Sequence, residues 1–333
     1  MNPVIAFIKA SRWQNMLMIA LTMILTRVCV IYAFFDILTP GINVPLNRGL
    51  SNLDFSLLVV SSMLIAAAGN MINDYFDLKI DRINKPNKII IGRFIKRRIA
   101  MVAHLTLSGI GVAIAAYLSY KIGIIELVFI QLIVVATLWF YSTDFKRRLI
   151  WGNLAIAFCV AIIPMVVWLF EILSMIHSNK TLIAEEVEAK AFFMQYAMVT
   201  LSWVGGLGAF SFVMTIAREI TKDIIDIKGD EAYGCNTLPI KLGIVKSKNI
   251  VSAIYLIVLA GTLFVQQVFL PDNLTMSYIV IAIAPFILAS LILTFKGKKT
   301  ADFSTPSLLN KVASLMAVLY LIVVFYILNP SGA

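Results

Sequence analysis

The stretch "NMINDYFDLKIDRINKP", residues 70–86, concentrates acidic residues at the end of a strongly apolar run. Its aspartates are Asp74, Asp77 and Asp81. Spacings of three and four residues place all three carboxylates on one face of a helix. Like charges at this spacing repel one another, so the face needs a positive partner if all three stay ionised.

The same spacing recurs 149 residues later in "TKDIIDIKGDE", residues 221–231. The aspartates of this second motif are Asp223, Asp226 and Asp230. A single motif of this kind is usually a solvated helix end. Two copies, each at the end of an apolar run, indicate one shared functional site.

The surrounding composition is that of an integral membrane protein. Of the 333 residues, 60% are hydrophobic and 14% are charged, and the mean hydropathy is +0.92. The apolar residues form blocks of about 20, the length of a helix that crosses a bilayer core. Segments such as "LIVVATLWF", residues 132–140, are apolar on every face, which argues against the alternating strands of a membrane barrel. We therefore predict an all-α, polytopic membrane helical bundle.

We predict about nine transmembrane helices in a single domain, residues 1–333, made of two loosely similar halves with one acidic motif each. The predicted spans are residues 16–37, 55–73, 99–119, 123–141, 150–172, 193–217, 249–270, 275–295 and 309–328. Arg27 falls inside the first span, where an unpaired charge is costly, so we expect a structural partner for it in the bundle interior.

Lysine and arginine residues predict the orientation of the bundle. With a cytoplasmic N-terminus, 23 of the 28 lie in segments on the cytoplasmic side, as the positive-inside rule requires. Both acidic motifs then lie on that side of the cell (inner or plasma) membrane. The net charge of +10 reflects this topology and attraction to membrane lipids. We expect neither a nucleic-acid partner nor an obligatory protein partner.

The acidic motifs suit Mg²⁺, an ion that binds through one or two carboxylates and bridges to substrate phosphates. Two facing motifs would hold a diphosphate and stabilise the charge that develops when an allylic carbon–oxygen bond ionises. An apolar interior would hold the hydrocarbon chain of the substrate and exclude water. Candidate diphosphate ligands beside the motifs are Asn70, Asn73, Arg82, Lys85 and Lys222.

At three segments the chain resembles the UbiA superfamily of intramembrane prenyltransferases. The segments are "NDYFDLKIDRINKP" after the second span, "YSTDFKRRLIWGN" after the fourth and "REITKDIIDIKGDEAYGCNTLPIKLG" after the sixth. The resemblance implies a helical bundle with a central cavity capped by cytoplasmic loops, and a Mg²⁺-bound polyprenyl diphosphate.

The resemblance assigns roles to individual positions. It places metal ligands at the six aspartates, above all at Asp74, Asp77, Asp226 and Asp230, while Asp81 and Asp223 hold a lysine or support the ligands. Lys146 and Arg147 match a family segment that begins at Tyr141, and Arg12 and Asn15 in "SRWQNMLMIA" match an R-x-x-N start. These four residues join the candidate diphosphate ligands.

The third segment looks most like the geranylgeranylglycerol-phosphate geranylgeranyltransferase branch, which implies ether-lipid synthesis with release of pyrophosphate. The segment "NKIIIGRF", residues 87–94, departs from the R-P-[I/L]-x-S-G pattern of relatives. The lipophilic acceptor therefore stays open, and an aromatic acceptor of quinone biosynthesis is the alternative. A cation-binding transporter is the non-enzyme alternative, although transporters place ionisable groups near the bilayer midplane rather than at one face.

Overall fold

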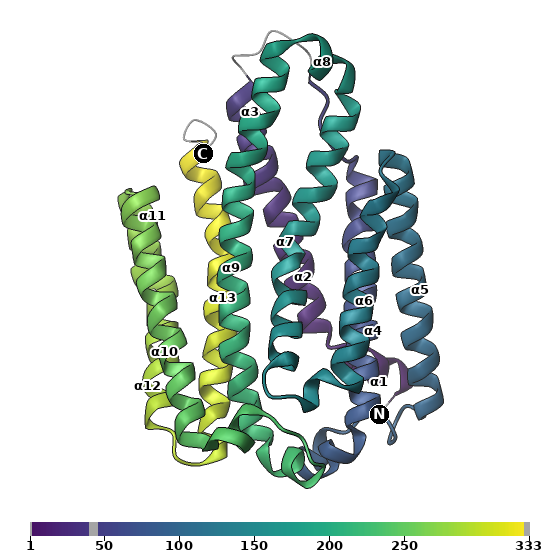
Figure 1. Cartoon of the computed structure of the whole chain (residues 1–333), viewed down its shortest axis with the longest axis vertical. Coiled ribbons are helices and arrows are strands. Elements are labelled where there is room, and N and C mark those ends of the chain that lie inside the picture. The colour runs from purple at the N-terminus through teal and green to yellow at the C-terminus, as the bar shows by residue number, and fades with distance from the viewer. Residues whose placement is uncertain (1, 40–45, 330–333) are drawn as a thin grey trace.

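The computed structural model describes residues 2–39 and 46–329, and every regular element in them is helical (Figure 1). Within these residues nine helical segments are long and apolar enough to cross a membrane. They are Trp13–Leu38, Asn52–Asn84, Arg97–Ile122, Ile125–Thr143, Trp151–Ser178, Val187–Ala232, Leu238–Phe269, Asn273–Lys296 and Thr300–Leu328. Each overlaps one predicted span, so the predicted helical membrane bundle is confirmed.

Most spans are single helices, and two are interrupted. The spans without a π-helical segment contain α4 (Asn52–Asn84), α5 (Arg97–Ile122), α6 (Val128–Thr143), α7 (Trp151–Ser178), α9 (Val187–Ala232), α10 (Leu238–Phe269) and α13 (Ser304–Leu328). Helix α10 is kinked at Gly243, whose φ of 80° and ψ of 162° are not helical. A π-helical segment joins α2 (Trp13–Leu25) to α3 (Ala33–Leu38), and another joins α11 (Asn273–Tyr278) to α12 (Ala284–Lys296). The short helices α1 (Pro3–Ala10) and α8 (Lys180–Glu185) lie outside the spans.

The helices that carry the acidic motifs are longer than a membrane is thick. Helix α4 has 33 residues and α9 has 46. At 1.5 Å per residue these helices measure about 50 Å and about 70 Å, whereas a bilayer core is about 30 Å thick. Both motifs therefore continue the helices of their spans, and both emerge at the lower end of the bundle in Figure 1.

Local sequence explains where α4 begins and ends. The Ser51 hydroxyl accepts a hydrogen bond from the backbone N–H of Asp54, which caps the first turn. At the other end Lys85 precedes Pro86, and the residue before a proline disfavours helical backbone angles. The helix consequently stops one turn after the first motif.

At the end opposite the motifs, Arg27 is buried in an ion pair. Its Nε lies 2.7 Å from Glu171 Oε1, and its guanidinium stacks over the rings of Tyr32 and Phe55. It also donates a hydrogen bond to the carbonyl of Leu50, whose own N–H donates to Glu171 at 3.0 Å. The expected structural partner of Arg27 is therefore Glu171. Together the two side chains hold the loop at Leu50, before α4, against α7.

We predict that Arg27→Met destabilises the protein by about 3–5 kcal/mol, because it leaves the Glu171 carboxylate buried without a cation. Equilibrium unfolding in mixed micelles measures the change. The double variant Arg27→Met/Glu171→Met should recover most of the loss, since both charges are gone. A double variant as unstable as Arg27→Met would show that the ion pair is not the source of the effect. Arg48→Met, which breaks an exposed pair with Asp36, is the matched control.

Candidate active site

The two acidic motifs are in direct contact. Asn84 at the end of α4 donates from Nδ2 to the carbonyl of Asp226 and accepts from the N–H of Gly229, both at 2.8 Å. Next to it, Lys85 Nζ lies 2.5 Å from Asp226 Oδ2. A side chain at position 229 would place its Cβ 2.5 Å from Asn84 Nδ2 and would displace the side chain that makes both hydrogen bonds.

Lys146 adds a second link between the motifs. It lies in the connection between α6 and α7 and forms an ion pair with Asp77 of the first motif. Burial opposes its charge, but Asp77, Tyr141 and Asp230 outweigh that effect and raise the pKa of Lys146 above its ordinary value. One protonated lysine therefore interacts with carboxylates of both α4 and α9.

Arg12 holds the next aspartate of the first motif. Its Nη2 lies 2.8 Å from Asp74 Oδ1. Arg12 adopts a left-handed backbone conformation, φ 56° and ψ 58°, at the junction of α1 and α2. This conformation is uncommon for a residue other than glycine and is typical of functional sites. Here it turns the guanidinium towards α4.

The remaining aspartates have different surroundings. Asp223 accepts a hydrogen bond from Asn153 Nδ2 at 3.0 Å, and Asp81 makes no hydrogen bond or ion pair with any residue in 2–39 or 46–329. Neither aspartate forms an ion pair with a lysine in these described residues, and the other expected role, support of the metal ligands, stays a prediction. The lysines contact Asp77 and Asp226 instead, because Lys85 and Lys146 come from segments that cross between the helix ends.

A cavity of about 580 Å³ lies within the bundle, as predicted, and it is lined by Asn73 and Lys222, each next in sequence to a motif aspartate, but by none of the six aspartates. This volume is within the range of about 300–1,000 Å³ that is usual for sites that bind small molecules. Its wall is apolar towards the membrane interior, where Met16, Ile19, Leu138, Ile163 and Val318 contribute. Its polar end includes the predicted residues Arg12, Asn15, Asn70, Asn73 and Lys222.

The other predicted phosphate ligands divide into two groups. Asn70 donates to the carbonyl of Ser11 at 3.0 Å, and Lys222 pairs with Glu219 at 2.8 Å, so both are held at the cavity. Arg82 and Arg147 are exposed, and neither forms an ion pair within the described part of the chain. Neither of these two arginines lines the cavity.

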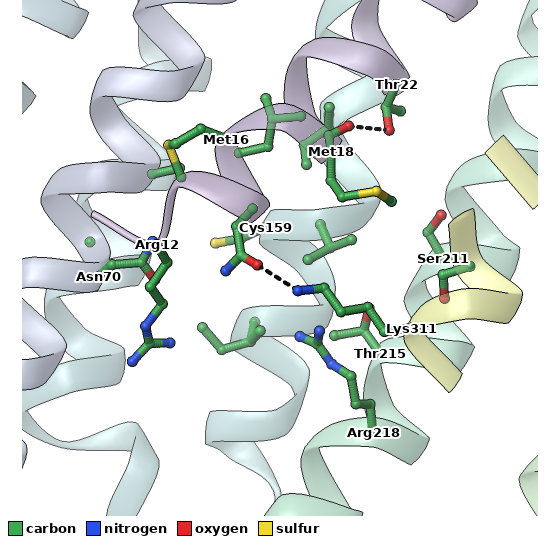
Figure 2. Close-up of a pocket in the computed structure, with 18 of the residues that line it drawn as sticks. Arg12, Met16, Met18, Thr22, Asn70, Cys159, Ser211, Thr215, Arg218 and Lys311 are labelled. Atoms are coloured by element: carbon green, nitrogen blue, oxygen red, sulfur yellow. Dashed lines mark hydrogen bonds between the residues drawn. The ribbon is translucent and has the colours of Figure 1, made fainter. Parts of the chain in front are cut away.

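Four polar residues were not predicted and belong to the same region. They are Asn153, Arg218, Glu219 and Lys311. Asn153, Arg218 and Glu219 lie within the segments that carry the family resemblance, but their spacing in the sequence did not indicate a function for them. Lys311 lies near the start of the last span and looked like an ordinary membrane anchor. It donates to Asn15 Oδ1 at 3.1 Å (Figure 2).

The donor atoms fit Mg²⁺ only if the substrate contributes ligands as well. In the residues described, no three His, Cys, Asp or Glu side chains are grouped so as to hold a metal by themselves. Within the motif segments, residues 70–86 and 221–231, three buried oxygens nevertheless have no hydrogen-bond partner: Asn73 Oδ1, Asp226 Oδ1 and Asp230 Oδ1. Magnesium commonly uses one or two carboxylates and completes its shell with water and phosphate oxygens. The site therefore suits a metal shared with a diphosphate.

Known proteins share this sequence and fold. The model of the UbiA prenyltransferase family matches residues 40–315. A digeranylgeranylglyceryl phosphate synthase from Methanothermobacter thermautotrophicus is 30% identical over 264 residues, which cover 78% of this chain and 81% of that protein.

Two solved structures have the same fold. One, from work on digeranylgeranylglyceryl phosphate synthase in membranes, has a TM-score of 0.62 at 20% identity and covers 98% of this chain and 99% of its own. The other is a UbiA homolog from Archaeoglobus fulgidus bound to GPP and Mg²⁺. Its TM-score is 0.55 at 15% identity, and the match covers 97% of this chain and 99% of that homolog. With the family match, these findings make the chain an integral membrane enzyme that belongs to the UbiA prenyltransferase family.

Proposed function

We propose that the protein transfers a geranylgeranyl group from its diphosphate to geranylgeranylglycerol phosphate and releases pyrophosphate. The observation that carries the proposal is the contact between the two acidic motifs at the polar end of an apolar cavity. The name of the Methanothermobacter relative supports this acceptor over an aromatic one. That the chain is one domain of two similar halves stays a prediction.

The proposed metal ligands are the aspartates of both motifs: Asp74, Asp77, Asp81, Asp223, Asp226 and Asp230. The partnerless oxygens of Asp226 and Asp230 support the second motif most directly. Bound Mg²⁺ would supply the Lewis acid that stabilises charge on the departing diphosphate. GPP and Mg²⁺ in the Archaeoglobus homolog support this choice of ion.

The cations of the site would bind and orient the diphosphate. Arg12, Lys85 and Lys146 each pair with a motif carboxylate and stand beside the place where phosphate oxygens would lie. Asn70, Asn73 and Lys222 line the adjoining end of the cavity. Arg82 and Arg147, which are exposed, would attract the anionic substrate to the mouth of the site.

The reaction exchanges one carbon–oxygen bond for another. The bond between the allylic carbon and the diphosphate breaks, and the diphosphate leaves with the electron pair. A hydroxyl oxygen of the acceptor forms an ether bond to that carbon, and its proton passes to the released diphosphate. The apolar wall around Met16, Ile19 and Leu138 would hold the prenyl chain and keep water from the carbocation-like centre.

We further propose that the end bearing the motifs faces the cytoplasm and that the protein resides in the plasma membrane. The lower end of the bundle in Figure 1 carries the connections rich in lysine and arginine, including residues 85–96 and 144–150. The positive-inside rule assigns such connections to the cytoplasm.

We predict that Asp74→Asn and Asp226→Asn each lower pyrophosphate release by at least about 10²-fold, because each removes negative charge from the metal site. The assay contains purified protein, Mg²⁺, geranylgeranyl diphosphate and geranylgeranylglycerol phosphate. Glu231→Gln is the matched control, since this exposed carboxylate directly follows the second motif. Normal turnover in both aspartate variants would refute the proposed metal site.

Gly229→Ala tests the contact between the motifs. The added methyl group meets the Asn84 side chain at 2.5 Å and must displace it, which breaks its hydrogen bonds to α9 and loosens the helix ends. We predict a fall in kcat of about 10²-fold, the cost of a displacement of about 1 Å in an active site, with little change in thermal stability. Gly205→Ala in the same helix meets nothing within 4 Å and should leave kcat unchanged. Equal effects of the two substitutions would contradict the prediction.

A panel of acceptors tests the proposed substrate. With geranylgeranyl diphosphate as the donor, we expect product with geranylgeranylglycerol phosphate and none with hydroxybenzoate or dihydroxynaphthoate. Extraction and mass spectrometry of the lipid products measure the outcome. Prenylated aromatic acid as the main product would replace the ether-lipid assignment with a quinone-type one.

A further inference from the structure

The lining of the cavity carries more positive than negative charge. Arg12, Arg218, Lys222 and Lys311 line the cavity, and within the described residues Glu219 is the one carboxylate that lines it with them. Glu219 pairs with both Arg218 and Lys222, and Arg12 pairs with Asp74 outside the lining. The lining therefore has an excess of positive charge.

Among the cations of the lining, Lys311 is the one that has no carboxylate partner in the described residues. Its Nζ donates to the neutral Asn15 side chain, and no carboxylate within residues 2–39 or 46–329 lies within 4.0 Å of it. The charged groups that act on it most are the cations Arg218 and Arg12. Figure 2 shows its ammonium group beside the guanidinium of Arg218. Two cations in a poorly solvated cavity repel each other strongly unless an anion lies between them.

The neighbourhood of this pair can donate hydrogen bonds to an anion. The Nε of Arg218 is buried and has no hydrogen-bond partner. Ser211 and Thr215 precede Arg218 on the same face of α9 and line the cavity with it (Figure 2). Arginine presents a planar group of donors that matches phosphate oxygens, and lysine adds a point charge.

We propose that Arg218 and Lys311, with Asn15 orienting the lysine, bind the phosphate monoester of the acceptor. This inference rests on the proposed function and specifies how its acceptor is selected. A phosphate monoester carries a charge of about −1.5 to −2 at neutral pH, more than the single charge of an aromatic carboxylate. The excess charge of the cavity therefore favours phosphorylated glycerol lipids over aromatic acids and neutral alcohols.

The position of the pair separates the acceptor from the donor. Arg12, Lys85 and Lys146 are paired with motif carboxylates, where we place the diphosphate. Figure 2 shows Arg12 beside Asn70 on one side of the cavity, and Arg218 and Lys311 on the other. An acceptor whose phosphate is bound by Arg218 and Lys311 would direct its glycerol hydroxyl towards the space between this phosphate and the diphosphate of the donor.

Steady-state kinetics of Arg218→Gln and Lys311→Gln test the proposal. We expect the KM for geranylgeranylglycerol phosphate to rise about 10- to 100-fold in each, which corresponds to one lost hydrogen bond to a charged group. The KM for geranylgeranyl diphosphate and kcat should stay near their wild-type values. Lys311→Arg should restore much of the affinity, and Lys246→Gln, which removes an exposed cation elsewhere, is the matched control.

A second acceptor, geranylgeranylglycerol without its phosphate, identifies the group that is recognised. The wild-type enzyme should prefer the phosphorylated acceptor, and the variants should lose that preference. If the KM for the donor rises instead, the pair binds the diphosphate and the proposal is overturned. If the preference for phosphate is unchanged in the variants, the proposal is also overturned.

The design separates this inference from the function on which it rests. A wild-type enzyme that uses neither glycerol acceptor refutes the proposed function itself. A wild-type enzyme that uses the phosphorylated acceptor, with variants that behave like it, refutes only the role of Arg218 and Lys311. If Arg218→Gln fails to fold because Glu219 loses a partner, Lys311→Gln decides the test alone. Its new amide retains a donor for Asn15, and no carboxylate in the described part of the chain depends on Lys311.

Discussion

The contact between the ends of α4 and α9 is the constraint on which the active site depends. Two apolar helices could cross a membrane without meeting at this end, and six aspartates on separate helices would repel one another. Asn84 binds the backbone of α9 at Asp226 and Gly229, and the missing side chain of Gly229 gives it room. Lys85 and Lys146 then offset the negative charge that the contact concentrates.

The negative charge of the motif aspartates is balanced by cations from three connecting segments. Every cation that pairs with a motif carboxylate comes from outside the membrane spans: Arg12 precedes the first, Lys85 follows the second and Lys146 follows the fourth. These segments are close together only in the folded bundle. The site is thus assembled where three connections meet the ends of two long helices, with the cavity beginning directly beside them.

Sequence reasoning reached the features that depend on local pattern. Apolar runs predicted all nine spans, and the repeated aspartate spacing predicted two helical acidic faces. It could not predict which cation pairs with which aspartate, because Lys146 and Asp77 are 69 residues apart and meet through packing. Lys311 was missed for the same reason: its partner Asn15 is 296 residues away, and a lysine at a helix end looks like a membrane anchor.

The two ends of the bundle use ion pairs in different ways. Arg27 and Glu171 have side chains only 5% and 0% exposed, so neither can leave its partner without stranding a buried charge. At the motif end, Arg12 and Lys85 are 41% and 40% exposed, and water can solvate them when a carboxylate changes partner. Incoming phosphate oxygens can therefore replace the carboxylates as partners of these cations, which would leave the aspartates available to Mg²⁺. In the proposed function, the buried pair would keep the scaffold fixed while the exposed pairs exchange partners as the anion binds.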